Sequence, residues 1–467
     1  MKIVRTIAII FVLLATNSAS AADWPQYLGP NRDATSNEKG LMRSWPADGP
    51  KVLWTFPLAE GYAGPAISEG KVYIYDRVEN KTDILRCIDL VTGKEDWTFS
   101  YEAPGSVSRY NGNKSVPAID GNRIYICDLL GNLHCVDKKS HKAIWHKNIW
   151  TDFGGTDLPE FGIGQSPLIY QNLVIVASQT KSTGVVAYDK ETGKLVWKTA
   201  NLGDVGYVSP TLVKISGTDQ VVMIPAGEET EQADHNSGMD PNETENSAPG
   251  AGRGGPGGAQ GSAPGAGPGA PPSGAAQQRN ATIKGTVTGF DPKTGAILWS
   301  YTGFQCHRPV NNVLAIGKNR LFMYGGDGGS AIIQIEKTNN SYTVKELLKN
   351  KFGAMINPAV LYKDYLYGNW YTLSARDGMV CMDLNCEVKW KTKKAPLFER
   401  GGLILVDDMI INNADGTFYL IEPTPEGFKM LSKAKLLDKK EEFVPFALSD
   451  GKLVVRGKTQ MKCVQVK

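Results

Sequence analysis

The chain has 467 residues, of which 51 are Lys or Arg and 48 are Asp or Glu. Without the first 21 residues, which carry Lys2 and Arg5, 49 basic side chains would face 48 acidic ones, a formal net charge of +1. A surface so evenly balanced gives no electrostatic reason to expect nucleic-acid binding.

The first 21 residues have the order of a secretory signal peptide. Met1–Arg5 is positively charged, Thr6–Ala15 is apolar but too short for a stable membrane anchor, and the segment ends in small residues up to Ala21. No cysteine precedes Cys87, so a lipid-modified cysteine at a new N-terminus is not expected. We expect residues 1–21 to be removed and the mature protein to be periplasmic or secreted, with no transmembrane segment.

An eleven-residue pattern then recurs along the chain. Its best copy is Ala187–Trp197, in which a small residue is followed by Asp189, Thr192, Gly193 and finally Trp197. Further copies are Cys87–Trp97, Cys135–Trp145 (with His141 in place of glycine), Gly289–Trp299 and the shortened Met379–Trp390. The repeat residues are Asp89, Asp137, Asp189, Asp291, Asp383, Gly93, Gly193, Gly295, Trp54, Trp97, Trp145, Trp197, Trp299 and Trp390.

Each copy predicts a pair of strands joined by a tight turn. The aspartate side chain can bond nearby backbone amides, glycine supplies a positive φ, and the tryptophan of the next strand buries a large surface. A second strand pair precedes each motif, as in Val116–Cys127. Every unit therefore reads as four short antiparallel strands.

The spacing of the tryptophans predicts a closed ring of eight units. The first gaps are 43, 48 and 52 residues, and a unit at about Pro309–Lys349 has lost its tryptophan. Four strands at a period in the forties is typical of propeller blades. Phe443–Lys467 has room for three strands, and the strand Lys51–Pro57 would supply the fourth and remove two open sheet edges. A linear array is the alternative, but it leaves both edges exposed.

This repeat, over Pro50–Lys467, resembles that of the PQQ-like propeller superfamily, which contains quinoprotein alcohol dehydrogenases and the outer-membrane protein assembly factor. We therefore expect an all-β, eight-bladed β-propeller of four-stranded antiparallel blades over residues 50–467, closed by an N-terminal strand. The leader, residues 22–49, begins with Asp23–Arg32, which resembles the start of many exported members. It should pack on the propeller, because Trp24 and Tyr27 are costly to expose.

Residues 228–284 interrupt the fourth unit between its second and third strands. They are dominated by Gly, Ala, Pro and Ser, a composition typical of disorder, although a docking segment is the alternative. Cys87, Cys135, Cys381 and Cys463 all occupy the first position of the motif in different units, too far apart for disulfides. A disulfide between Cys127 and Cys135 is left open, and Cys306 and Cys386 are unassigned.

The resemblance to quinoprotein dehydrogenases implies a calcium ion held by carboxylate and amide ligands, an Asp base, and a cover over the quinone, commonly a disulfide between adjacent cysteines. This sequence has no adjacent cysteine pair and no Cys-x-x-Cys-His haem attachment. Asp152, Asp157 and Glu160 have no metal-loop spacing and are interpreted as solvated loop residues. No catalytic residue, metal site or cofactor is predicted, and PQQ with calcium is the alternative.

Polar residues gather in the segments that lead into each first strand, which in propellers line one mouth of the channel. The candidates for ligand or partner binding are Arg109, Asn113, Gln165, His307, Arg308, Asn312, Asn357, Glu399 and Arg400, with Asn111, Lys114, Tyr207 and Asn311 in the same segments. Such residues suit a protein, peptide or glycan, although loops are polar in any case.

The sequence thus favours an exported, non-catalytic and monomeric binding or protein-interaction scaffold. The chain departs from the assembly factor by lacking a lipid-anchor cysteine and by carrying the long insert, so outer-membrane assembly itself is not predicted. The alternative is a divergent PQQ-dependent oxidoreductase that acts on alcohols or sugars.

Overall fold

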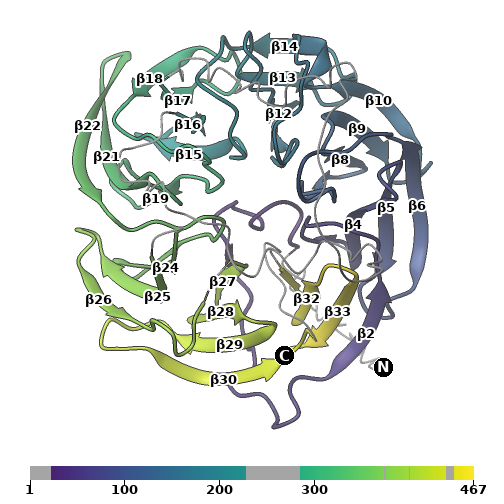
Figure 1. Cartoon of the computed structure of the whole chain (residues 1–467), viewed down its shortest axis with the longest axis vertical. Helices are drawn as coiled ribbons and strands as arrows, with labels where there is room; N and C mark the ends of the chain where they lie inside the picture. The colour runs from purple at the N-terminus through teal and green to yellow at the C-terminus, as the bar shows by residue number, and fades with distance from the viewer. Residues whose placement is uncertain (1–22, 228–283, 373–374, 399, 438–445) are drawn as a thin grey trace, which may run out of the picture.

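The computed structural model describes residues 23–227, 284–372, 375–398, 400–437 and 446–467. Eight blades stand around a ring, and each has four strands in antiparallel order (Figure 1). The sheet of one blade is extended by a fifth, parallel strand, β1 (Thr35–Ser36). In the described residues the only helical element is a single 3-10 turn, η1 (Thr151–Phe153). None of these residues forms a helix that could span a bilayer. The predicted all-β, eight-bladed propeller is confirmed.

Blades 1 to 4 follow one another in the chain. Blade 1 contains β3 (Ala66–Ser68), β4 (Lys71–Val78), β5 (Thr82–Asp89) and β6 (Glu95–Glu102). Blade 2 contains β7 (Ala118–Asp120), β8 (Arg123–Cys127), β9 (Asn132–Asp137) and β10 (Ala143–Asn148). Blade 3 contains β11 (Leu168–Tyr170), β12 (Leu173–Ala177), β13 (Val185–Asp189) and β14 (Leu195–Lys198). Blade 4 contains β15 (Thr211–Ile215), β16 (Thr218–Met223), β17 (Val287–Phe290) and β18 (Ile297–Tyr301).

Blades 5 to 8 complete the ring. Blade 5 contains β19 (Leu314–Ala315), β20 (Arg320–Gly325), β21 (Gly329–Thr338) and β22 (Ser341–Asn350). Blade 6 contains β23 (Val360–Tyr362), β24 (Tyr365–Tyr371), β25 (Arg376–Asp383) and β26 (Val388–Lys391). Blade 7 contains β27 (Leu403–Val406), β28 (Met409–Ala414), β29 (Thr417–Glu422) and β30 (Lys429–Lys435). Blade 8 contains β31 (Ala447–Ser449), β32 (Lys452–Arg456), β33 (Gln460–Gln465) and β2 (Val52–Pro57).

The ring is closed by its first blade strand. β2 pairs antiparallel with β33, and Trp54 lies opposite Cys463. The chain's N-terminal part therefore completes the sheet that its C-terminal part begins, which removes two sheet edges that would otherwise be exposed.

The small first residue of each motif lies opposite the motif's tryptophan. Cys87 faces Trp97, and Ala187 faces Trp197, each just before a register shift. The same cross-strand position explains the buried, unpaired thiols of Cys135, Cys381 and Cys463. The disulfide left open between Cys127 and Cys135 is absent, because Cys127 pairs with Leu133 and both thiols are free.

The tryptophans also join neighbouring blades. The Trp145 indole N–H donates to the Lys190 carbonyl at 3.0 Å, and a Cβ on Gly193 would lie 2.7 Å from that indole ring. Glycine is needed here both for its φ of 68° and because the ring covers it. Where His141 replaces glycine, it stacks on Trp97 with ring centroids 4.4 Å apart.

The aspartates of the motif close the turns as their spacing predicts. One carboxylate oxygen of Asp189 accepts hydrogen bonds from the backbone N–H and the hydroxyl of Thr192, at 2.9 and 2.8 Å. Asp89 does the same with Thr92, and Asp137 with Ser140.

The leader runs across the centre of the ring (Figure 1, purple). Trp24 exchanges two backbone hydrogen bonds with Ile67 of β3, and Pro25 accepts one from Ile119 of β7. The Arg32 guanidinium donates to the Pro167 carbonyl at 2.9 Å, just before β11. The leader thus contacts the innermost strands of blades 1, 2 and 3.

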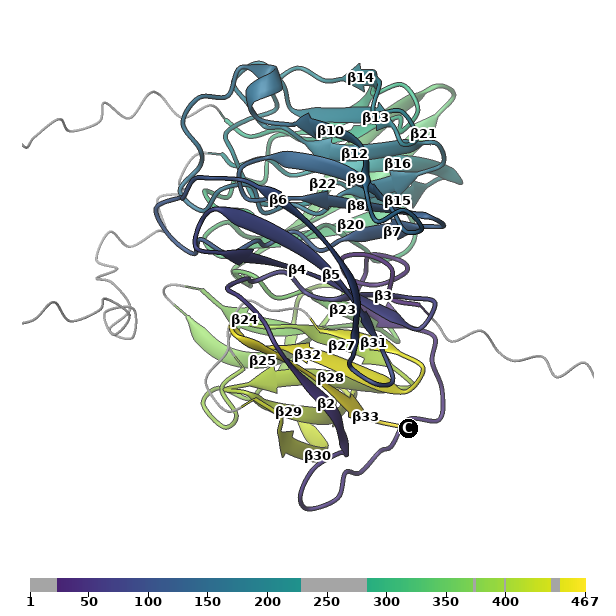
Figure 2. The same cartoon turned by 90° about the vertical axis from the view of Figure 1, so that its right-hand side faces the viewer.

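The leader then leaves along blades 7 and 8. β1 (Thr35–Ser36) pairs parallel with β27, and a carboxylate oxygen of Glu38 accepts a hydrogen bond from the Gly451 N–H at 2.7 Å. In the side view the leader passes on the side of β3 and β7 (Figure 2). The leader therefore fills the ring's centre from that side.

Two predicted segments lie outside the described residues. These are the signal peptide, residues 1–21, and nearly all of the insert, residues 228–283, which falls between β16 and β17.

Candidate functional site

In each antiparallel blade, two kinds of connection meet at the same end. The segments that lead into the first strand and the turns between the second and third strands both lie there, because successive strands reverse direction. This end is opposite the turns on which the leader enters. We call it the mouth face.

Four aromatic rings and one arginine follow each other along the mouth face. The ring of Tyr62 lies 5.4 Å from that of Tyr110, Tyr110 lies 5.9 Å from Phe161, and Phe161 lies 5.5 Å from Tyr207. The Arg308 guanidinium lies 5.5 Å from the centre of the Phe161 ring. These five residues, which we call the mouth arc, come from the connections into blades 1 to 5, and the four rings are half-buried.

Glu160 joins two of the predicted site residues. Its carboxylate accepts a hydrogen bond from Arg308 at 2.9 Å and lies 3.6 Å from the Nε of Arg109. The three side chains are between about a third and a half exposed, so the pairs are screened by water. Glu160 is a partly exposed loop residue, as interpreted from the sequence, and it also pairs with arginines from two other connections.

Lys114 lies beside the mouth arc, and the pKa of its amine is lowered. Its Nζ donates to the carbonyls of Tyr110 at 2.6 Å and Gly112 at 3.1 Å, and it lies 5.7 Å from the centre of the Tyr62 ring. Burial lowers the pKa of Lys114 to about 7. Burial also raises the pKa of Tyr207 to about 12.

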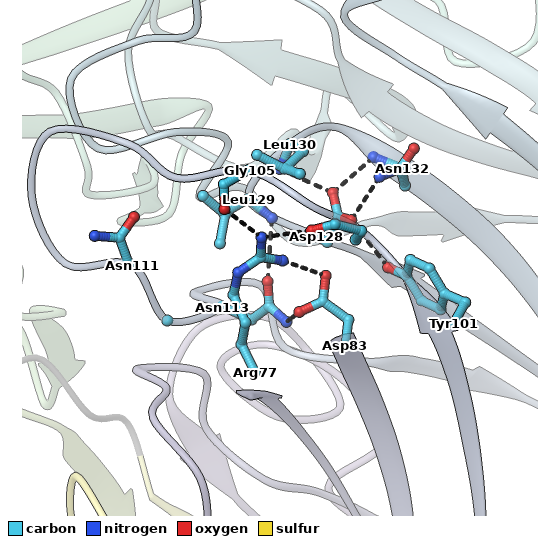
Figure 3. Close-up of polar contacts among 12 residues, drawn as sticks. Arg77, Asp83, Tyr101, Gly105, Asn111, Asn113, Asp128, Leu129, Leu130 and Asn132 are labelled. Atoms are coloured by element: carbon cyan, nitrogen blue, oxygen red, sulfur yellow. Dashed lines mark hydrogen bonds and ion pairs between the residues drawn. The ribbon is translucent and has the colours of Figure 1, made fainter. Parts of the chain in front are cut away.

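A buried polar cluster supports the connection that carries Lys114 (Figure 3). Arg77 and Asp83 form an ion pair at 2.7 Å, with both side chains almost fully buried. Asn113 donates to Asp83 at 2.8 Å and accepts from the Leu129 N–H at 3.1 Å. Asn113 therefore anchors the connection to blades 1 and 2, and its side chain is not available to a ligand.

Asp128 occupies the neighbouring turn of blade 2. It accepts hydrogen bonds from the Leu130 and Asn132 amides, both at 2.8 Å, and from the Tyr101 hydroxyl at 3.0 Å. Burial, followed by the nearby Asp128 charge, raises the pKa of Asp83 to about 7, although Arg77 and Asn113 oppose this. Figure 3 shows Asp128 and Asp83 one above the other beside the Arg77 guanidinium.

Two further candidates, Gln165 and Asn357, hold backbone groups of the ring. Gln165 bonds both the N–H and the carbonyl of Ala177, and Asn357 donates to the Gly401 carbonyl at 2.7 Å. Arg400 is only 7% exposed and lies 5.4 Å from the centre of the Tyr371 ring. The structure therefore separates Asn357 and Arg400 from the mouth arc. Glu399 lies outside the described residues.

Asn312 lies in a small pocket between the leader and blades 5 and 6. Tyr27, Arg32 and Tyr324 also line this pocket. Both polar atoms of the Asn312 side chain are buried and make no hydrogen bond within the described residues.

His307 precedes Arg308 and is tied to a turn of blade 5. Its backbone N–H donates to Asp327 at 2.9 Å, and the Cys306 thiol donates to the same carboxylate at 2.8 Å. The segment Gly325–Gly329 forms a hairpin turn, with its two end residues paired. Burial and Asp327 raise the pKa of the Cys306 thiol, so it is a poor nucleophile.

The described residues do not fit a calcium-bound quinone. Around the mouth the acidic groups are engaged elsewhere: Asp83 by Arg77, Asp128 by turn amides, Glu160 by arginines and Asp327 by a thiol and an amide. Within the described ranges, no three His, Cys, Asp or Glu side chains gather as a metal-binding group would require.

The binding residues predicted from the sequence include only part of the mouth arc and its neighbours. Arg109, Arg308, Lys114 and Tyr207 were recognised as residues of the connections, but Tyr62, Tyr110, Phe161 and Glu160 were not. Aromatic residues within polar loops were the available signal, since each of these connections carries one. These residues come together only because the blades are arranged in a ring, and no local sequence pattern predicts which residues of different connections then touch.

Comparisons with known proteins agree with the repeat. The family model described as "Outer membrane protein assembly factor BamB" matches residues 28–172 and 80–252. Quinohemoprotein alcohol dehydrogenase ADH IIB of Pseudomonas putida is 31% identical over 119 residues, which are 24% of this chain and 16% of that protein. The matched segment is thus a minor part of that curated relative's length.

Two solved structures share the fold over nearly the whole chain. A europium-containing methanol dehydrogenase has a TM-score of 0.62 at 13% identity, covering 95% of this chain and 89% of that one. BamB from Moraxella catarrhalis has a TM-score of 0.54 at 14% identity, covering 89% and 98%. The chain is therefore an eight-bladed β-propeller that is similar both to quinoprotein alcohol dehydrogenases and to the assembly factor BamB.

Proposed function

We propose that this propeller is an exported, non-catalytic scaffold of the cell envelope that binds an extended peptide segment of a partner protein at the mouth arc. The observation that carries the proposal is the row of four half-buried rings next to Arg308, contributed by five successive connections. Such a row presents a continuous contact surface that no single blade could form.

The chemistry of the mouth arc suits a peptide. Tyrosine and arginine are enriched among the residues that dominate binding energy at protein interfaces, and aromatic rings lose little conformational entropy when they are covered. Arg308 can bind a carboxylate with two parallel hydrogen bonds once it exchanges Glu160 for a ligand. The leader enters the centre of the ring from the side opposite the mouth face.

The supporting comparison is with the outer membrane protein assembly factor BamB, whose fold covers 89% of this chain. The dehydrogenase alternative lacks a fitting donor set among the described residues, as set out above.

The test is a selection of peptides from a random library against the mature protein, followed by calorimetric titration of one selected peptide. Phe161→Ala should weaken binding at least about tenfold, since truncating a central interface residue often costs 2 kcal/mol or more. Val196→Ala, which alters an exposed apolar residue of the outer strand β14, should leave the affinity unchanged.

Equal binding by the wild type and Phe161→Ala would place the peptide elsewhere and contradict the proposal. In a second arm the protein is incubated with PQQ and calcium and assayed for alcohol and sugar oxidation. Oxidation of an alcohol or a sugar in that arm would contradict the scaffold proposal and favour the enzyme alternative.

A further inference from the structure

A buried arginine of the leader has no acidic partner. Arg32 is 4% exposed, and its guanidinium donates to the carbonyls of Pro167 at 2.9 Å and Ser166 at 3.4 Å. A third hydrogen bond goes to the side-chain oxygen of Gln26 at 3.3 Å, so all its partners are neutral. The Nε–H of Arg32 is buried and makes no hydrogen bond, and the side chain forms no ion pair with a carboxylate of the described residues.

The charge of Arg32 persists in this setting. Burial lowers the pKa of Arg32 to about 10, so the guanidinium is still protonated at pH 7. A buried charge that has no opposite charge beside it is costly to a fold. The structure around Arg32 therefore favours a negatively charged partner.

Arg32 lines the pocket between the leader and blades 5 and 6, and so does a second unsatisfied side chain. Asn312 is 5% exposed, and neither polar atom of its amide makes a hydrogen bond within the described residues. Buried polar side chains are nearly always hydrogen-bonded in native proteins. One small group in this pocket would serve both Arg32 and Asn312.

The rest of the lining favours a hydrogen-bond acceptor at this place. The Tyr324 hydroxyl accepts a hydrogen bond from the Ala359 N–H at 2.6 Å, which leaves its own proton to donate. Asp33, the one acidic residue of the lining, is partly exposed, and its carboxylate accepts hydrogen bonds from the N–H and hydroxyl of Thr35 at 3.0 and 2.6 Å. The charge of Asp33 is thus screened by water, whereas that of Arg32 is not.

The size of the pocket limits what can bind. Its volume is about 10 Å³, which is room for one water-sized group. A phosphate or a carboxylic acid does not fit into that space, but a single halide ion does. A water molecule would also satisfy the amide, yet it would leave Arg32 without an opposite charge.

We infer that this pocket binds a chloride ion, which joins Arg32 of the leader to Asn312 of the connection into blade 5. The Arg32 Nε–H and the amide N–H of Asn312 both donate to the ion. The ion also supplies the negative charge that no described carboxylate provides. This site goes beyond the proposed function and does not rest on peptide binding.

Crystals of the mature protein grown with sodium bromide test the site directly. Bromide takes the place of chloride and is located by its anomalous scattering. We expect an anomalous peak within hydrogen-bond distance of the Arg32 Nε and the Asn312 amide. A water at that position and no anomalous peak would overturn the inference.

Urea unfolding tests the same site in solution. About 0.15 M sodium chloride should lower the unfolding equilibrium constant at least about tenfold relative to the same concentration of sodium gluconate, because a ligand that binds only the folded chain stabilises it by mass action. Gluconate is too large for the pocket. Equal ionic strength keeps the screening of surface charges the same.

Two variants at position 312 separate a bound ion from a general salt effect. Asn312→Asp places a carboxylate beside Arg32, so it should lose the chloride effect and be about as stable in gluconate as the wild type is in chloride. Asn312→Leu fills the pocket with an apolar side chain, so it should lose the chloride effect and be less stable than Asn312→Asp.

Asn357→Asp is the matched control. Asn357 is another buried amide with an unsatisfied oxygen, and it lies outside the pocket lining. This variant should keep the tenfold chloride effect, whatever its own stability. An equal chloride effect in the wild type and in Asn312→Asp would overturn the inference, as would the absence of a chloride effect in the wild type.

Discussion

Arg308 donates a hydrogen bond to Glu160 at 2.9 Å across 148 residues of sequence. Glu160 also lies 3.6 Å from Arg109, so one carboxylate connects the segments that lead into blades 2, 3 and 5. Glu160 therefore holds two arginines at the mouth arc. A ligand carboxylate could replace Glu160 as their partner.

Glu160→Gln should release both arginines with little effect on the fold. The free energy of unfolding should change by less than about 1 kcal/mol, because exposed ion pairs contribute little. Peptides with acidic residues should bind more tightly, and their affinity should fall more steeply with added salt. Urea unfolding and calorimetry at two salt concentrations check this, and a loss of affinity for acidic peptides would contradict it.

Gly193→Ala tests the contact between neighbouring blades. The new methyl group would meet the Trp145 ring at 2.7 Å and force a φ of 68° on alanine. Gly70→Ala is the matched control, since Gly70 has a φ of 71° and nothing within 4 Å of an added Cβ. In both variants the free energy of unfolding should fall by about 1 kcal/mol because of the strained backbone. In Gly193→Ala it should fall by about a further 1–3 kcal/mol because of overpacking.

Denaturant unfolding measures that difference. Equal stabilities of Gly193→Ala and Gly70→Ala would show that the indole moves aside at no cost, and the docking of tryptophan on glycine would then not determine how blades pack.

His134 should make the protein less stable in acid. Burial and then the neighbouring His146 lower the pKa of His134 to about 3 from a reference value of 6.5. Between these values the unfolded chain binds a proton that the folded chain does not, so stability falls as pH falls from about 6.5 to 3, by at most about 1.4 kcal/mol per pH unit. His134→Phe should remove this slope in unfolding measured from pH 6.5 downward.

Asp83 should act with the opposite sign. Its raised pKa of about 7 means that the folded chain holds a proton that the unfolded chain has lost between about pH 4 and 7. Its contribution therefore favours the fold at low pH and is lost as pH rises through that window. In Asp83→Asn the side chain is neutral at every pH and Arg77 keeps its hydrogen bonds to the Ala103 and Gly105 carbonyls, so the variant should gain stability relative to the wild type as pH rises from 4 to 7. An identical pH slope in the two proteins would contradict the raised pKa.

Ring closure can be tested by truncation. Removing the chain through Pro57 deletes β2, including Trp54, whose indole N–H donates to the Leu90 carbonyl at 2.9 Å. It also exposes the edge of β33, so we expect aggregation or strong destabilisation. Removal through Asp23 alone should be mild, and equal melting temperatures for the two truncations would contradict closure by β2.

The fold was predictable because each blade repeats the same local chemistry. Asp189, Gly193 and Trp197 each have a role within one turn or strand pair, so their spacing in sequence reports their geometry directly. The free cysteines followed from the same logic, since Cys87 and Ala187 share one cross-strand position. The hairpin disulfide was not decidable from sequence, because it depended on a register that places Cys127 opposite Leu133.

The mouth arc was only partly predictable. Arg308 and Arg109 stood out as charged residues of the right connections, but their partner Glu160 had no local signal that set it apart from Asp152 or Asp157. Conversely, Asn113 has the composition of a binding residue and instead anchors the backbone through Asp83. Which polar side chains face inward depends on packing between blades, and sequence periodicity carries no information about that.

The central claim is that the partner covers the mouth arc, and hydrogen exchange with and without a selected peptide tests it most directly. The account predicts slower exchange in the connections that contain Tyr62, Tyr110, Phe161 and Tyr207, with unchanged exchange in the outer strands β14 and β18. Protection confined to those outer strands, or to the leader, would contradict the account.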